Sequence, residues 1–234
     1  MIIASEVSKS FQSEVLGSVS LHVGAGELCC LLGAGGAGKS TLIKILLGLI
    51  APSSGRASID GIDCTGDPLA VRKLAGYLPD HLAFCEEFTP RQNVRYHLEL
   101  AGMPPAGTQE IRDALRDVGI PDDAFSRPSR FLSQEQRQGM GIAIAQVRNV
   151  PVLLADDPTA GLDPSATGRI IELLSTMKER GTAILLATRD PYLARLADTV
   201  AILRRGHLVV HKPVGQFPPE ELDRIYHQPF TTQR

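Results

Sequence analysis

The sequence predicts an α/β fold, in which a core of buried strands and helices joins an antiparallel β subdomain and a helical insertion subdomain. Three observations indicate this class. A glycine-rich loop over residues 33–41 stands between a buried strand and an apolar helix. Alternating strands occupy much of the first 60 residues. Helical patterns then fill residues 86–150, and short apolar strands return after them.

The amino-terminal part combines antiparallel strands with one buried strand and one helix. Alternation of apolar and polar residues predicts antiparallel strands over residues 2–11, 19–23 and 54–60. The apolar run within residues 27–32 predicts a buried strand. Helical spacing of the apolar residues that follow predicts a helix over 41–49.

The rest of the chain is expected to alternate helices with short strands. Thr89 and Pro90 are a typical N-cap and first helical residue, so we expect a helix that ends near residue 101. The further expected elements are helices over 108–118, 133–149 and 166–180, and strands over 75–79, 152–155 and 182–187. Their continuous apolar runs make the last two strands typical of a buried parallel sheet.

Residues 33–41 match the pattern G-x-x-x-x-G-K-S/T at every required position. The loop consists of Gly33, Ala34, Gly35, Gly36, Ala37, Gly38, Lys39, Ser40 and Thr41. Glycines let main-chain N–H groups surround a β-phosphate, and the following helix presents its positive end to the anion. We expect Lys39 to reach the β- and γ-phosphates and Ser40 to give its hydroxyl to Mg²⁺. A glycine-rich turn that binds nothing is disfavoured by the strand–loop–helix context, so the sequence predicts a P-loop NTPase core.

Two acids follow the strand over residues 152–155. Asp156 stands where the strand ends, which is where a P-loop fold places the acid that holds Mg²⁺ through water. Asp156 and Asp157 could instead cap the next element. Because a complete phosphate loop is present, we favour the metal role for Asp156.

Composition excludes several classes of protein. The 234 residues carry a net charge of −2, so no basic field predicts a nucleic-acid partner. The longest apolar run, 42–51, contains Lys44 and is too short to span a bilayer, and the first residues lack the pattern of a signal peptide. We therefore expect a cytoplasmic protein that reaches a membrane only through a partner.

The cysteines and histidines show no metal-ligand spacing. Cys29 and Cys30 are neighbours on a strand, so their side chains point to opposite faces. We expect both to be small core residues rather than a disulfide. His81, His97 and His207 are expected at the surface or at the rim of a site.

Three segments resemble the ATP-binding subunits of ABC transporters. They are Leu132–Gln138 (the signature segment), Val152–Pro158 and Thr159–Asp163. Their order and spacing relative to the phosphate loop are specific to that family, and the resemblance covers nearly the whole chain. Residues 76–79, followed by Asp80, are most similar to the type-2 exporter branch. The domains implied are an ABC-type nucleotide-binding domain over 1–212, with its helical subdomain at about 86–150, and a short tail over 213–234.

The resemblance implies a mechanism and two partners. Two such subunits, identical or different, close head to tail over two ATP molecules with Mg²⁺. Their closure pulls on a membrane permease subunit of the type-2 kind, at the inner face of the cell membrane. Phe11 would stack on adenine, Ser133 would touch the partner's γ-phosphate, and Asp163 would lie at the dimer seam. The permease would dock around residues 80–103, which include Phe84, Phe88 and Tyr96.

The chain also departs from the pattern of this family. Gln134 and Glu135 replace the two signature glycines, so side chains obstruct the phosphate and Glu135 adds a repelling charge. Asp157 replaces the catalytic Glu, and its shorter side chain reaches less far toward a water molecule. Arg189 replaces a His that contacts the γ-phosphate, and Asp80 replaces a Gln that senses the metal and the water. Together these changes predict slow hydrolysis.

Several of these positions have a purely structural alternative. Ser133 with Gln136 also forms a capping box, and Asp157 could cap the turn at Pro158. Arg189 could be a solvated cation, and Phe11 could pack in the core.

Two functions from different classes remain open. One is an ATPase subunit that drives a transporter, and the other is a nucleotide-binding partner that hardly hydrolyses ATP. A DNA-repair or translation protein of this family is disfavoured because the chain has neither a coiled-coil insertion nor a second cassette.

Overall fold

Two sheets and the helices packed on them make up the computed structural model, which describes the chain apart from residues 81, 219–220, 223 and 225–234. The strands of the first sheet are β1 (Ile2–Ser10), β2 (Glu14–Val23), β4 (Ser54–Ile59) and β5 (Ile62–Asp63). They lie in the order β2-β1-β4-β5, with each neighbouring pair antiparallel. The predicted antiparallel part is therefore confirmed. The second strand begins at Glu14 rather than residue 19, because shifts in its pairing with β1 interrupt the alternation.

The second sheet is mainly parallel. Its strands are β3 (Leu28–Leu32), β6 (Ala75–Leu78), β7 (Val152–Asp156), β8 (Ala183–Thr188), β9 (Thr199–Arg204) and β10 (His207–Pro213). They lie in the order β10-β9-β3-β8-β7-β6, and only the pairing of β10 with β9 is antiparallel among the described residues. The carboxyl ends of β3, β7 and β8 therefore meet at one edge, which is where open α/β sheets bind ligands.

The helices follow the sequence predictions where these had a long pattern. They are α1 (Lys39–Leu46), α2 (Pro68–Leu74), α3 (Pro90–Leu100), α4 (Thr108–Asp117), α5 (Gln134–Val147), α6 (Pro164–Glu179) and α7 (Pro191–Ala194). Short 3₁₀ turns cover Asp122–Ser126, Ser129–Phe131 and Val214–Gln216. Sequence analysis missed α2 and α7, which are too short for a periodic pattern but begin at Asp67 and Asp190 caps followed by proline.

The helix α1 lies between the two sheets. It contacts β7 of the parallel sheet and β1, β2 and β4 of the antiparallel sheet. Adjacent residues of β3 face different cores: Cys29 packs with α1 and the antiparallel sheet, whereas Cys30 packs with the helices on the other face. Both cysteines are buried and free, which confirms their prediction as core residues. Burial raises the pKa of the Cys29 thiol to about 12.

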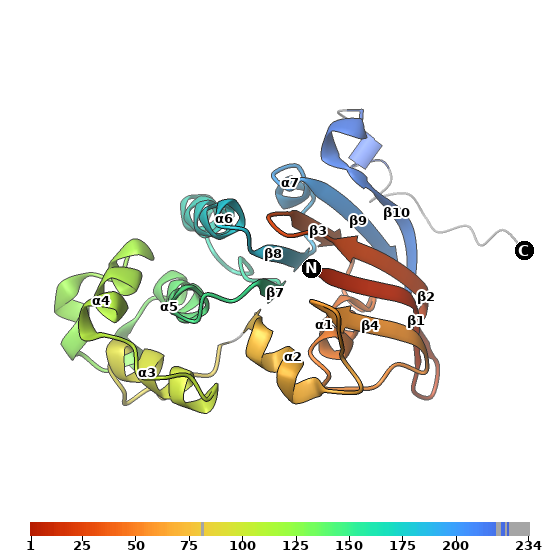
Figure 1. Ribbon diagram of the computed structural model, residues 1–234. Helices are drawn as coiled ribbons and strands as arrows, with labels where there is room; N and C mark the ends of the chain where they lie inside the picture. The colour runs from red at the N-terminus through yellow and green to blue at the C-terminus, as the bar shows by residue number, and fades with distance from the viewer. Residues whose placement is uncertain (81, 219–220, 223, 225–234) are drawn as a thin grey trace, which may run out of the picture.

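A block of helices stands beside the parallel sheet (Figure 1). It consists of α3, α4 and α5, of which α5 contacts both of the others as well as α6 and β6. The block lies within the interval 86–150, where a helical insertion was expected. None of the described helices combines the length and apolar character that a membrane span requires.

Packing of α1 between the sheets should make its apolar face essential for stability. We expect Ile43→Ala, at a site with no exposed surface, to lower the free energy of unfolding by about 2–5 kcal/mol. The matched control is Leu69→Ala on α2, where the leucine is 68% exposed and the expected change is within about 0.5 kcal/mol. Urea unfolding of the two variants measures both values. Equal losses would contradict the assigned position of α1.

Candidate nucleotide-binding site

The phosphate loop is fixed between β3 and α1 by close main-chain contacts. A Cβ on Gly38, which has φ +105°, would lie 2.6 Å from Leu16 Cδ2 and 2.9 Å from the carbonyl oxygen of Val15. A Cβ on Gly33 would lie 2.5 Å from the carbonyl oxygen of Leu203. Glycine is therefore required at both ends of the loop, because β2 and β9 approach its main chain directly.

Lys39 opens α1 with its ammonium group turned back into the loop. The residue is only 7% exposed, and its Nζ donates hydrogen bonds to the carbonyl oxygens of Gly33 at 2.6 Å and Ala34 at 3.1 Å. Burial lowers the pKa of Lys39, the carboxylate of Asp157 opposes this change, and Arg189 adds to it. The ammonium thus lies at the base of the loop and is hydrogen-bonded to neutral carbonyl groups.

A cleft of about 190 Å³ opens above the loop. It is lined by Val15, Gly35, Gly36, Ala37, Gly38, Lys39, Ser40, Thr41, Asp80, Asp156, Asp157 and Arg189. The fold thus brings most of the predicted site residues to one place, although they come from four separate parts of the chain. Val15 is the lining residue that sequence analysis missed. It lies in the part of β2 where the strand pattern is interrupted, so no local signal marks it.

Asp157 and Arg189 form an ion pair inside this cleft. Arg189 Nε lies 3.5 Å from Asp157 Oδ2, and the Thr188 hydroxyl donates to Asp157 Oδ1 at 3.4 Å. Burial raises the pKa of the Asp157 carboxyl, and Arg189 acts to lower it. The carboxylate of Asp157 therefore faces the cleft. The main-chain carbonyl of Asp157 closes the turn that follows, because it accepts a hydrogen bond from Ala160 N at 3.0 Å.

Arg189 reaches across the phosphate loop rather than standing away from it. Its side chain is 67% exposed, yet its Nη1 lies 3.5 Å from the position that a Cβ on Gly35 would occupy. The planar guanidinium can form two parallel hydrogen bonds with a carboxylate or a phosphate, in a bidentate arrangement. An incoming phosphate would therefore meet Arg189 already paired with Asp157.

The donor and acceptor groups of this cleft fit a triphosphate with Mg²⁺. Lys39 and the main-chain amides at the start of α1 supply positive charge. The exposed Ser40 hydroxyl and the Asp156 carboxylate, which line the same cleft, supply oxygen ligands. Asp156 does not cap the next helix, since the N-cap of α6 is Asp163. ATP with Mg²⁺ is the cofactor that this donor set accepts.

Asp80 completes the cleft on the side of β6. Its main-chain carbonyl accepts a hydrogen bond from Gln138 Nε2 of α5 at 3.0 Å. Burial raises the pKa of nearby Tyr77, and the charges of Asp156 and Asp80 raise it further. The position of Asp80 therefore depends on contact between β6 and the helical block.

Phe11 and Ser133 do not line this cleft. Phe11 is 63% exposed, and the Lys9 ammonium lies 4.9 Å from its ring centroid, so the alternative of a core role is wrong. Ser133 is the N-cap of α5: its hydroxyl accepts from Gln136 N at 3.2 Å, and Gln136 Oε1 accepts from Ser133 N at 3.0 Å. The capping box is confirmed, and a phosphate contact of Ser133 stays a prediction.

Glu135 forms an ion pair that the sequence did not predict. Its carboxylate is paired with Arg169 of α6, whose Nη2 donates to Glu135 Oε2 at 2.8 Å. Packing of α6 on α5 brings this cation, which stands 34 positions later in the chain, to the Glu135 carboxylate, and the expected repulsion of a phosphate stays a prediction. Gln134 is engaged as well, since its Nε2 donates to the carbonyl oxygen of Ala160 at 2.7 Å.

Two of the histidines considered in the sequence, His97 and His207, do not line the cleft. His97 is half-buried and contacts Phe84 edge to face, with ring centroids 5.6 Å apart. His207 is exposed, with its Nε2 3.4 Å from Glu14 Oε1. His81 lies outside the described residues.

Comparisons with known proteins relate most of the chain to one family. A family model described as ABC transporter matches residues 16–160. The methionine import ATP-binding protein of Caulobacter vibrioides is 37% identical over 89% of this chain and 66% of its own length. The ABC transporter ATP-binding protein YtrE of Bacillus subtilis is 34% identical over 83% of this chain and 87% of its own. The chain spans about two thirds of the methionine import protein.

Solved structures agree in fold. An ATP-binding subunit of an ABC transporter has a TM-score of 0.84 at 26% identity, covering 97% of this chain and 100% of its own. A dimeric ATP-binding cassette bound to ADP and Pi has a TM-score of 0.83 at 24% identity, with 93% and 100% covered. The assignment of residues 76–80 to the type-2 exporter branch finds no support here, because methionine import proteins are among the relatives.

Lys39 should be essential for holding a triphosphate. We expect Lys39→Ala to weaken binding of a fluorescent ATP analogue by about 100-fold, which corresponds to about 2.7 kcal/mol, because the buried cation is lost. The control is Lys44→Ala, which removes an exposed lysine from the same helix and should leave binding unchanged. Circular dichroism checks that both variants fold. Undiminished binding in folded Lys39→Ala would overturn the assignment of the loop.

Proposed function

The chain belongs to the ABC transporter family, and on that premise we propose that it is the ATP-binding subunit that drives a membrane permease. One observation carries this proposal: the phosphate loop, the two acids after β7 and Arg189 line a single cleft. These groups combine the means to hold a triphosphate with a carboxylate that can accept a proton. An isolated glycine-rich turn would have neither the acids nor the cation.

In the proposed reaction each residue of the cleft has a separate task. Lys39 and the loop amides would hold the phosphates. Ser40 and Asp156 would hold Mg²⁺, which would neutralise phosphate charge. Asp157 accepts a proton from the attacking water, and Asp80 orients that water. Arg189 leaves Asp157 for the γ-phosphate, so arrival of the nucleotide frees the base.

Residues outside the cleft would complete the site. We propose that Phe11 stacks on the adenine, because an exposed aromatic ring offers a free face to a base. Ser133 would face the γ-phosphate that a second subunit holds, and Asp163 would lie at the seam between the subunits. The segment 86–150 would move as a helical subdomain within a nucleotide-binding domain over 1–212. In the tail 213–234, Val214, Phe217 and Leu222 pack on the core of that domain, and residues 219–220, 223 and 225–234 lie outside the described part of the chain.

Two copies of the chain are the proposed dimer. Each copy carries a complete phosphate loop and a signature segment whose Glu135 charge is compensated, so two equal composite sites can form. The solved relative that is a dimer with ADP and Pi supports this arrangement. We propose that the dimer sits at the inner face of the cell membrane, held there by the permease.

Import of an amino acid such as methionine is the proposed transport reaction. Its support is the printed name of the import proteins to which the chain is similar. The alternative of a subunit that binds ATP but hardly hydrolyses it finds no support in these comparisons.

The proposed docking site for the permease is a groove between the helical block and α2. Its volume is about 420 Å³, and it is lined by Leu47, Leu49, Arg72, Ala75, Tyr77, Pro79, Leu82, Ala83, Phe84, His97, Gly141, Ile144 and Arg148. Phe84 reaches into it, whereas Phe88 and Tyr96 form an edge-to-face pair nearby, with centroids 5.9 Å apart.

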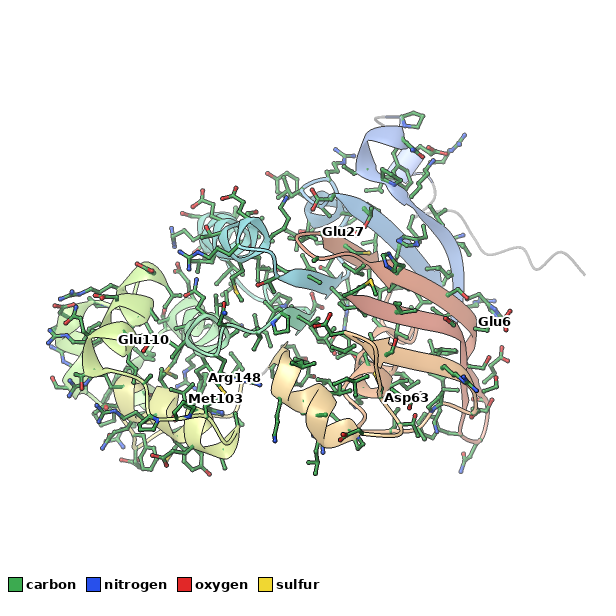
Figure 2. The ribbon with its side chains drawn as sticks, viewed as in Figure 1. Glu6, Glu27, Asp63, Met103, Glu110 and Arg148 are labelled. Atoms are coloured by element: carbon green, nitrogen blue, oxygen red, sulfur yellow. The ribbon has the colours of Figure 1, made fainter. Side chains whose placement is uncertain are left out.

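Charge in this groove favours an acidic partner segment. Arg148 Nη2 donates to the main-chain carbonyls of Arg72 at 2.9 Å and Lys73 at 3.1 Å, so it lies between α5 and α2 (Figure 2). Its buried Nε has no acceptor among the described residues, and burial lowers the pKa of the group. No carboxylate from the described part of the chain lines the groove. An apolar segment that carries an acid would fit.

Turnover of MgATP by the purified chain tests the proposed function directly. We expect turnover in the parent and none in Lys39→Ala. Asp157→Glu restores the longer side chain that is usual in the family and tests whether reach limits the rate. Absence of turnover in the parent and in Asp157→Glu would overturn the proposal of an ATPase.

The Asp157–Arg189 pair predicts a pH dependence. A base works only when ionised, so turnover should fall as the pH drops through the raised pKa of Asp157. In the free enzyme Arg189 pairs with Asp157 and lowers that pKa, so Arg189→Ala should move the low-pH fall of kcat/KM to higher pH. Asp157→Asn should reduce turnover by about 100-fold or more, and the remaining turnover should no longer fall at low pH. Values of kcat and kcat/KM between pH 5 and 9 measure this.

The control for charge is Arg189→Lys, whose low-pH fall should lie between those of the parent and Arg189→Ala. A low-pH fall that persists in Asp157→Asn would assign the proton acceptor to another group.

Substitutions in the groove should weaken binding of the permease without changing binding of ATP. We expect Phe84→Glu and Ala83→Glu to reduce copurification with the permease at least tenfold, because each adds an acid to a surface that must receive one. Binding of the ATP analogue should stay unchanged. Ala83 is exposed, so Ala83→Glu should leave the fold intact, and a loss of permease binding in this variant would reflect docking alone.

Leu100→Glu is the matched control, since Leu100 is exposed on α3 but does not line the groove. Release of the permease by this variant, or unfolding by Ala83→Glu, would contradict the docking site.

A further inference from the structure

An ion pair stands directly beside Ser133, at the start of α5. From it we propose that Arg169 is a positioning residue, which neutralises Glu135 and holds it away from the nucleotide that the signature segment meets in the second subunit. This inference rests on the proposed function, because it concerns closure of the dimer. It assigns a task to a residue outside every motif of the family.

The guanidinium of Arg169 is fixed by three contacts on two helices. Its Nη2 donates to Glu135 Oε2 at 2.8 Å, and its Nε contacts the other carboxylate oxygen, so the pair is bidentate. Its Nη1 donates to the Ser165 hydroxyl at 2.7 Å, one turn earlier on α6. The fork of an arginine satisfies this geometry, whereas the single ammonium of a lysine does not.

Gln134 is turned toward its own chain in the same way. Its Nε2 donates to the carbonyl oxygen of Ala160, and a Cβ on Gly161 would lie 3.3 Å from that nitrogen. Gly161 has φ +75°, so glycine both permits the turn and makes room for the amide. Both side chains that replace the expected glycines are thus engaged by α6 and the loop before it.

Arg169 lies among several carboxylates. Its hydrogen bond lowers the pKa of Glu135, which therefore stays ionised. The charges of Glu135, Asp163 and Glu172 all raise the pKa of Arg169. Removal of Arg169 would leave these acids uncompensated beside the proposed seam, where a triphosphate also has to approach. The pair thus converts a charge that would oppose closure into a neutral one.

Association of the full chain driven by MgATP tests this inference. Light scattering follows association as MgATP is added, in the Asp157→Asn background, which slows turnover. We expect Arg169→Ala to raise the half-saturating MgATP concentration about tenfold, which corresponds to about 1.4 kcal/mol. Glu135→Gln combined with Arg169→Ala should return it to within about threefold of the parent. Binding of the ATP analogue to the single chain should stay unchanged.

The double variant separates electrostatics from structure. It lacks the ion pair as fully as Arg169→Ala does, so a purely structural role of the pair would leave association impaired and would overturn the inference. Arg127→Ala is the control, because it breaks another exposed pair, with Asp123 at 3.0 Å, and should change nothing.

The parent chain distinguishes this inference from the proposed function. Equal association of the parent and Arg169→Ala would overturn the inference alone. A parent that does not associate with MgATP would overturn the proposed dimer of two copies, and the inference with it.

Discussion

The site depends on one buried ammonium group. Lys39 is buried, and its hydrogen bonds go to the carbonyls of Gly33 and Ala34. Burying a cation is costly unless it is paired, and neutral carbonyls compensate only part of that cost. A phosphate that enters the cleft would meet a positive group that has little water left to lose. An anion bound in the cleft would pair with this cation, which links the stability of the fold to its ligand.

Two sheets are needed to hold that lysine in place. The loop begins at the end of β3, which is buried on both faces, and it ends in α1, which is clamped between the sheets. The antiparallel sheet contributes directly, because Leu16 and the main chain of Val15 approach Gly38 too closely for any side chain. Cores on both sides of β3 thus fix a loop that has almost no side chains of its own.

Much of the fold and of the cleft could be predicted because the signals are local. The phosphate loop is a run of consecutive residues, and Asp156 and Asp157 follow a short apolar strand. Val15 was missed because shifts in the pairing of β1 and β2 disturb the alternation. The setting of Glu135 could not be predicted either. Its partner Arg169 comes from α6, and only packing of that helix on α5 brings the two charges together.

Two acids that depart from the family pattern, Asp157 and Glu135, are each paired with an arginine. Asp157 has a shorter side chain than the usual glutamate, and Arg189, longer than the usual histidine, lies 3.5 Å from it. Glu135 brings a charge where a glycine is usual, and Arg169 neutralises it. Independent decay of a site would leave isolated defects, such as an unpaired acid facing phosphate. Because Asp157 and Glu135 each pair with a cation from another element, we infer that these two positions work as pairs with their partners rather than as isolated changes.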